Sequence, residues 1–259
     1  MSNQVGCRST LQSFWDRFEP TGPPFVHPED RDILRYPHFE YQDVESFARS
    51  PQFGTNDGSL QLGLTPCPYA GDLSRADVFV LLLNPGFDPV DLFGEHEIPD
   101  FSRAVERTLR QDLADEAFPN VYFNPKFCWS GAFRWWEAKL RDVAHAYQRH
   151  AGVDYWRSLQ VISQHLATLE LLPYHSVSSP PPFGRLASVA AARTFVNDTL
   201  VPKAKAGELT IIVTRRAVDW GLSAGISDDI VVYPPQHARS ASLTMNSVGG
   251  QALFRRLVS

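Results

Sequence analysis

An unbroken run of six apolar residues, Val78–Leu83, ends at the turn sequence Asn84-Pro85-Gly86. A strand with one solvated face alternates apolar and polar residues, so an unbroken run predicts a strand that is buried on both faces. Such strands belong mainly to parallel sheets that helices cover on both sides. The run therefore predicts an α/β fold. It also places Asn84 at the carboxyl end of a strand, where open parallel sheets bind ligands.

Three further segments predict strands of the same sheet, and helical patterns separate them. The predicted strands are Leu169–Leu172, Leu209–Thr214 and Ile230–Tyr233. The predicted helices are Asp100–Phe118, Gly131–Arg149, Tyr155–His165, Leu186–Val201 and Val248–Leu257. Strands that alternate with helices form βαβ units. We therefore expect a three-layer α/β/α architecture around a central four-stranded parallel sheet.

The first 60 residues carry no comparable strand pattern. They contain two short candidate helices, Leu11–Phe18 and Val44–Arg49, among many prolines. We interpret residues 1–60 as a loop-rich N-terminal extension that packs on a single α/β domain formed by residues 61–259.

Composition limits the class of protein. The chain has 29 acidic and 24 basic residues, a net charge of −5, so any nucleic-acid contact requires a local basic face. Its three cysteines, Cys7, Cys67 and Cys128, are widely spaced and predict neither a disulfide framework nor a metal site. We see no membrane-spanning run and no signal peptide, so we expect a cytoplasmic protein. We also expect that it uses no metal and no cofactor.

A second motif follows the last predicted strand. Residues 230–243 read Ile-Val-Val-Tyr-Pro-Pro-Gln-His-Ala-Arg-Ser-Ala-Ser-Leu, so His237 stands in a polar loop after a buried-type strand. Because parallel strands end at the same sheet edge, we expect His237 and Asn84 to approach each other. A lone histidine or an Asn-Pro-Gly turn is commonplace, but the two together at one edge indicate a catalytic site.

This pair of motifs resembles the uracil-DNA glycosylase superfamily, in the branch that carries Asn-Pro-Gly after its first strand. The resemblance covers roughly residues 62–259 and implies the three-layer fold of that family. It implies that the protein hydrolyses the N-glycosidic bond of a flipped DNA base and leaves an abasic site. By the same resemblance, Asn84 positions the attacking water and His237 hydrogen-bonds the departing base. The chain departs from the family where Ala238 replaces the usual proline and Ala241 the usual apolar wedge.

Further site residues follow from the resemblance. Arg239, Ser240 and Ser242 are expected to contact DNA phosphates, and Leu243 to fill the vacated base stack. The base pocket is expected to contain Phe87, Tyr122, Asn124, Tyr174 and His175. The partner would be DNA, either a duplex with a flipped base or a single strand, and no obligate protein partner is implied.

The substrate base differs from uracil in this interpretation. In the family the second strand commonly ends at a base-reading asparagine, but here the corresponding sequence is Tyr174-His175-Ser176. Superfamily members in bacterial antiviral defence excise glucosylated hydroxymethylcytosine from phage DNA, and we expect such a bulky modified cytosine. The alternatives are a uracil or mismatch repair glycosylase, a non-catalytic nucleic-acid-binding module and a hydrolase of small nucleosides. A Ser176–His175 nucleophile pair is a weaker alternative, because no G-x-S-x-G elbow is present.

Overall fold

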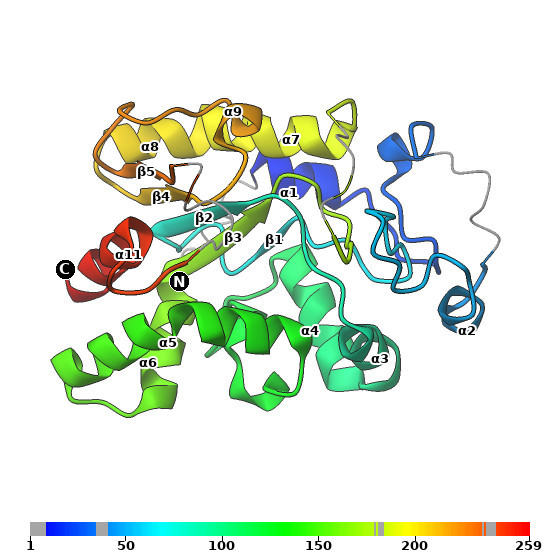
Figure 1. Ribbon diagram of the computed structural model, residues 1–259, viewed down its shortest axis with the longest axis horizontal. Coiled ribbons are helices and arrows are strands. Elements are labelled where there is room, and N and C mark those ends of the chain that lie inside the picture. The colour runs from blue at the N-terminus through cyan, green and yellow to red at the C-terminus, as the bar shows by residue number, and fades with distance from the viewer. Residues whose placement is uncertain (1–8, 35–40, 179, 181–183, 235, 237–241) are drawn as a thin grey trace, which may run out of the picture.

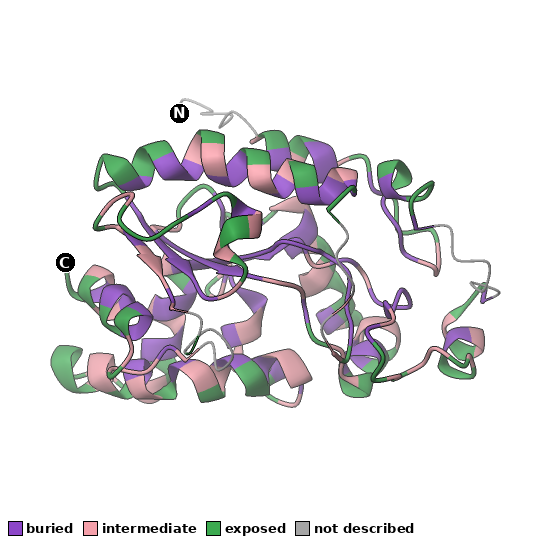
Figure 2. Cartoon of the chain, turned by 45° about the horizontal axis from the view of Figure 1, so that its top comes forward, coloured by how far each residue is buried: buried purple, intermediate pink, exposed green. Residues whose placement is uncertain are grey.

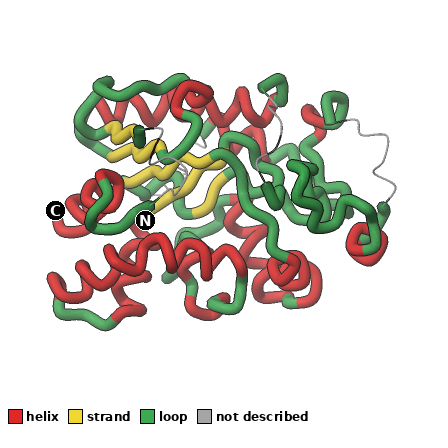
Figure 3. The backbone as a smooth tube through the Cα atoms, in the orientation of Figure 1, coloured by secondary structure: helices red, strands yellow, loops and turns green. Residues whose placement is uncertain are grey.

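The computed structural model describes residues 9–34, 41–178, 180, 184–234, 236 and 242–259. Within these residues, a central sheet has the strand order β1-β3-β2-β4-β5, with helices on both faces (Figures 1 and 3). The strands are β1 (Tyr69–Ala70), β2 (Val78–Leu82), β3 (Leu166–Glu170), β4 (Thr210–Val213) and β5 (Ile230–Val232). Strands β3, β2, β4 and β5 are parallel, and β1 pairs with β3 in the antiparallel sense. The predicted α/β fold with a mainly parallel sheet is confirmed.

The helices alternate with the strands along most of the chain. The α-helices are α1 (Thr10–Trp15), α2 (Val44–Ala48), α3 (Pro89–Glu97), α4 (Pro99–Arg110), α5 (Gly131–Ala151), α6 (Tyr155–His165), α7 (Ala187–Phe195), α8 (Val201–Lys205), α9 (Ala217–Trp220) and α11 (Val248–Val258). Short 3-10 turns cover Pro28–Asp30, Val121–Phe123 and Pro125–Phe127, and a π-helical turn, Val196–Leu200, joins α7 to α8.

Alternate residues of β2 enter two different cores. Val78 and Val80 pack with α5, α6 and α11, whereas Phe79 and Leu81 pack with α1, α7 and α8. All five residues of β2 are buried, which accounts for the apolar run without alternation. In Figure 2 the sheet is almost continuously buried, and the exposed positions lie on the outer sides of the helices.

The sheet differs from the prediction in two details. The predicted count of four strands was wrong because β1 adds an antiparallel edge strand, which at two residues is too short to produce a pattern. Strand β3 begins at Leu166 instead of Leu169, and it ends at Glu170. Thr168 and Glu170 interrupt the apolar pattern of this strand, yet both side chains are buried.

The helix predicted over Asp100–Phe118 is shorter in the structure. It begins at Pro99 and ends at Arg110, because Gln111 adopts a left-handed conformation with φ of 54°. The Gln111 side chain accepts a hydrogen bond from the Leu73 amide and donates one to the Gly71 carbonyl. These two bonds, to the segment just before β2, stabilise the helix end.

The described N-terminal residues contribute to the main core. Leu11, Trp15 and Phe47 are almost completely buried in the same cluster as β2. The hydroxyl of Tyr174 donates to Asp30 Oδ2 at 2.6 Å, which links the loop after β3 to this N-terminal segment. Leu11, Trp15 and Phe47 therefore share their packing with the sheet.

Candidate active site

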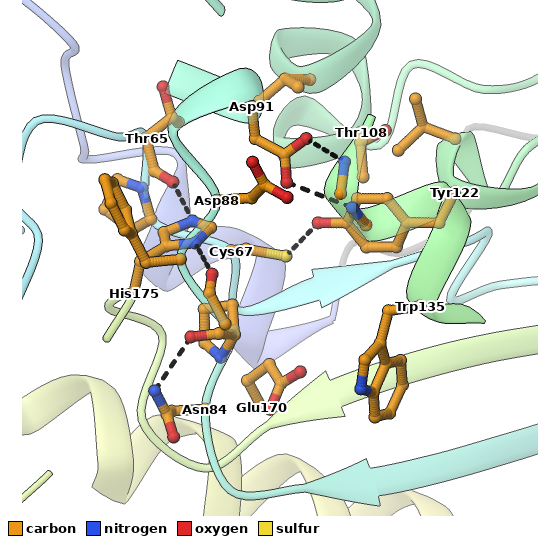
Figure 4. A pocket seen from close by; sticks show the side chains of 18 of the residues that line it. Thr65, Cys67, Asn84, Asp88, Asp91, Thr108, Tyr122, Trp135, Glu170 and His175 are labelled. Carbon is orange, nitrogen blue, oxygen red and sulfur yellow. Dashed lines mark hydrogen bonds between the residues drawn. The ribbon is translucent and has the colours of Figure 1, made fainter. Parts of the chain in front are cut away.

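A cavity of about 260 Å³ lies at the carboxyl ends of β2, β3 and β4, beside α3, α4 and α5. Its lining includes Asn84, Phe87, Trp135, Glu170 and Arg215, and Figure 4 shows many of the lining side chains. This is the sheet edge at which α/β proteins bind ligands. Among the described residues, no group of three or more His, Cys, Asp or Glu side chains could hold a metal ion. No described helix is both long enough and apolar enough to cross a bilayer.

Asn84 follows β2 and is held in a defined orientation. Its Nδ2 donates to the carbonyl of Pro85 at 2.9 Å and to the hydroxyl of Ser176 at 2.7 Å. Because a carbonyl oxygen can only accept, this side of the amide must be the NH₂ group. None of the described residues donates to Oδ1, so this oxygen can still accept a hydrogen bond. The arrangement can hold a water molecule.

His175 and Ser176 do not form a nucleophile pair. His175 is buried, and its ring nitrogens lie 2.7 Å from the carbonyl oxygen of Gly86 and 3.1 Å from that of Thr65. Burial lowers the pKa of His175, although the two carbonyls act in the opposite direction. The Ser176 hydroxyl donates to the Ser178 carbonyl instead of meeting the imidazole. Both side chains therefore fix the loop that contains Asn84 and Gly86.

Aromatic rings form part of the pocket wall. Phe87 is half-buried and packs edge-on against Phe53, with the two ring centroids 5.4 Å apart. Trp135 lies on α5 with 39% of its surface exposed. Tyr122 also lines the pocket, but its hydroxyl contacts Cys67 Sγ at 2.8 Å. Phe87 and Trp135 thus contribute aromatic surface to the pocket lining, whereas Tyr122 is engaged in a polar contact.

Glu170, the last residue of β3, is the most unusual polar side chain of the site. It is 7% exposed, and its Oε2 has no hydrogen-bond partner among the described residues. Burial raises its pKa well above the ordinary value, while the charge of Arg215 acts in the opposite direction. Figure 4 shows Glu170 at the pocket between Asn84 and Trp135. A buried neutral carboxyl group is a hydrogen-bond donor as well as an acceptor.

Two further carboxyl groups reach the pocket from α3. Asp91 accepts hydrogen bonds from the amides of Gly131 and Ala132 at the start of α5, and burial raises its pKa to about 6. Glu95 accepts from the Thr65 amide at 2.8 Å, and burial raises its pKa to about 8. Asp91 thus caps the start of α5, and both side chains line the pocket.

Two residues predicted for the base pocket lie elsewhere. Asn124 does not line the cavity, and its side chain caps the turn Pro125–Phe127 through the Lys126 amide. Tyr174 is 1% exposed and is also absent from the lining, because its hydroxyl is bound to Asp30. Both positions are explained by local capping and by packing.

The structure describes only part of the motif that follows β5. His237, Arg239 and Ser240 lie outside the described residues, so their predicted roles stay predictions. Ser242 is half-buried, and its carbonyl accepts from the Tyr233 hydroxyl. Leu243 is 1% exposed and packs in the core with α5 and α11. A wedge must be exposed to enter a base stack, so the structure corrects the assignment of Leu243 to that role.

The sequence prediction missed Glu170, Glu95 and Trp135. A signal existed for Glu95, because Asp91 and Glu95 are four residues apart and share one helical face. Glu170 could have been suspected from a carboxylate inside an otherwise strand-like segment. Trp135 gave no such signal, since it stands between Phe133 and Trp136, which are core residues of the same helix.

Comparisons of the chain with protein-family models, with curated proteins and with solved structures gave no match.

Proposed function

We propose that this protein is a DNA glycosylase with a uracil-DNA-glycosylase-like fold. It hydrolyses the N-glycosidic bond of a flipped base and leaves an abasic site. The observation that carries the proposal is Asn84, whose amide is oriented by Pro85 and Ser176 so that Oδ1 stays available for a water. This side chain lines a pocket at the ligand-binding edge of a parallel sheet.

In this mechanism the pocket receives a base that has left the DNA stack. Unstacking costs a few kcal/mol, which ring stacking and phosphate contacts must offset. Phe87 supplies a ring held in place by Phe53. Asn84 orients water toward the sugar carbon as positive charge develops there. His237 is expected to donate to the base carbonyl as negative charge grows.

A modified cytosine is the substrate that we favour, and glucosylated hydroxymethylcytosine of phage DNA is the first candidate. The cavity of about 260 Å³ lies just below the range of roughly 300–1,000 Å³ that is usual for drug-sized ligands, which suits one nucleobase. Gly86 is exposed at the lining, and a Cβ placed there would meet no atom within 4 Å. This open space favours a base with a bulky substituent. A uracil or mismatch repair glycosylase is the second candidate.

The test is base release from a panel of oligonucleotides, read by alkaline cleavage of the abasic product. The panel contains uracil, a thymine mismatch, hydroxymethylcytosine and its glucosylated form, each as duplex and as single strand. Asn84→Ala should lower the single-turnover rate by about 100-fold or more, because the water loses its acceptor. Asn56→Ala, at an exposed turn, is the matched control.

Three outcomes would contradict the proposal. DNA binding without release of any base would indicate a binding module. Absence of both binding and release would indicate a small-nucleoside hydrolase. Release that survives in Asn84→Ala would remove the assigned role of Asn84.

A further inference from the structure

The mechanism above leaves the carboxyl group of Glu170 unused. It is buried at the end of β3, and β3 pairs with β2 so that Glu170 stands opposite Leu82, two residues before Asn84. Its Oε2 is unpartnered among the described residues. An unpaired buried polar group costs free energy, so a group retained at a pocket wall is explained by a ligand that completes its hydrogen bonds.

From this position we infer that Glu170 is a general acid that donates its proton to the ring nitrogen N3 of the flipped base and thereby selects amino-pyrimidines of the cytosine type. The inference rests on the proposed function and adds to it a substrate class and a catalytic residue. Cytosine presents an acceptor, N3, beside a donor, its exocyclic amine. A neutral carboxyl group matches this edge with its O–H and its carbonyl oxygen.

The proton transfer makes a cytosine-type base a better leaving group. As the sugar–base bond breaks, its electron pair passes to the base ring, and the Glu170 proton moves to N3. The base departs as a neutral tautomer instead of an anion. Water adds to the sugar carbon and releases one proton, which restores the carboxyl group directly or through solvent. In uracil and thymine, N3 already carries a hydrogen and cannot accept this proton.

The surroundings of Glu170 suit both of its protonation states. Burial favours the neutral acid before the reaction, whereas the guanidinium of Arg215, which follows β4 at the same pocket, favours the carboxylate formed during it. The charged or titratable side chains that line the pocket from other elements are Cys67, Tyr69, Asp88, Asp91, Glu95, Tyr122 and His175. Burial raises the pKa of Cys67 to about 12 and that of Glu95 to about 8, and Arg215 is the charged side chain that counteracts the rise in the pKa of Glu170.

The experiment compares Glu170→Gln with the wild-type protein on two oligonucleotides that differ only in the target base. One carries hydroxymethylcytosine and the other hydroxymethyluracil, with glucosylated hydroxymethylcytosine added if the panel shows that the sugar is required. Glutamine keeps a donor and an acceptor but has no transferable proton. We expect the single-turnover rate on the cytosine-type base to fall about 100-fold or more, and that on the uracil-type base to change less than about tenfold. The control is Glu208→Gln, an exposed site.

Two supporting readouts separate acid catalysis from simple binding or folding effects. Affinity for DNA that contains a non-hydrolysable fluorinated analogue of the cytosine nucleotide should stay within about threefold in Glu170→Gln. The wild-type rate should fall at high pH with loss of one proton, and the glutamine variant should lack this limb. The wild-type profile can be measured even if the variant does not fold.

Failures of the two proposals can be distinguished. If the wild-type protein releases no base from any oligonucleotide, the glycosylase proposal fails and the inference fails with it. If base release occurs but Glu170→Gln loses both base types equally, or neither, the acid role of Glu170 is overturned alone. A wild-type rate that does not fall at high pH overturns it as well.

Discussion

The polar side chains at the amino ends of the parallel strands are more completely hydrogen-bonded than those at the carboxyl ends. At the amino ends, Asp77 precedes β2 and His165 precedes β3, and His165 Nδ1 lies 2.9 Å from Asp77 Oδ1. Next to them, Arg256 of α11 bonds to Asp229 at 3.0 Å and to the Thr210 hydroxyl at 2.9 Å. These side chains are hydrogen-bonded to one another.

At the carboxyl ends the side chains are oriented but not all satisfied. Asn84 is held by the hydrogen bonds that its Nδ2 donates to Pro85 and Ser176, yet its Oδ1 accepts from none of the described residues. Glu170 is buried, and its Oε2 has no hydrogen-bond partner in the described part of the chain. The polar groups at one edge of the sheet stabilise the fold, whereas those at the other edge stay partly unsatisfied, as the proposed ligand site requires.

Replacing Leu243 is expected to have the largest effect on stability. This residue tests whether a position assigned to DNA contact belongs to the core instead. It follows β5 and the predicted catalytic His237 in the sequence, yet it is 1% exposed in the core. Leu243→Ala should lower the free energy of unfolding by about 2–4 kcal/mol, because it leaves a cavity. Urea denaturation measures this, with Val248→Ala, an exposed site, as the control. A loss of DNA affinity without any loss of stability would restore the wedge assignment.

Glu95 provides a second test of the difference between the two edges. It is a buried acid at the pocket, so replacing it should stabilise the protein. Its raised pKa means that the folded state holds a proton that the unfolded chain releases above about pH 4.5, so stability falls as the pH rises toward about 8. Glu95→Gln removes this dependence and keeps an acceptor for the Thr65 amide. We expect a gain of about 1–3 kcal/mol at pH 8 and almost none at pH 4.5.

The measurement is thermal or urea unfolding at both pH values. Glu97→Gln, at an exposed position on the same helix, is the matched control. A gain of equal size at both pH values would contradict the assignment of the effect to protonation of Glu95.

Replacing Asp77 is expected to have the smallest effect, and it tests the contribution of the amino ends of the strands to stability. The hydrogen bond to Asp77 raises the pKa of His165, so the pair stabilises the fold below about pH 6.5 and loses this contribution as the pH rises through the raised pKa. Both side chains are about one-third exposed, which limits the contribution to about 0.5–1 kcal/mol. Asp77→Asn should lose this amount at pH 5.5 and nothing at pH 8.

Urea denaturation at the two pH values measures this loss, with Asp228→Asn, an exposed neighbour of β5, as the control. Base release should be unchanged in Asp77→Asn. A fall in its catalytic rate would break the separation of the two edges.

Local patterns predicted part of the site and missed the rest for identifiable reasons. Asn84 was found because a buried strand and a turn are adjacent in the sequence. Tyr174 was placed in the pocket because it follows β3, but Asp30, 144 residues away, draws its hydroxyl into the N-terminal packing. Glu170 was missed because its burial depends on what surrounds the end of β3.

The amino-acid sequence by itself determined the buried strand Val78–Leu82, its turn at Asn84 and the alternation of strands and helices. Apolar periodicity and turn chemistry act over a few residues, so they can be read from neighbouring positions. Only the tertiary structure decided that Glu170 is an unpaired acid at a pocket and that Leu243 is core. Burial and hydrogen-bond pairing are set by side chains that are distant in the chain, and no local pattern records them.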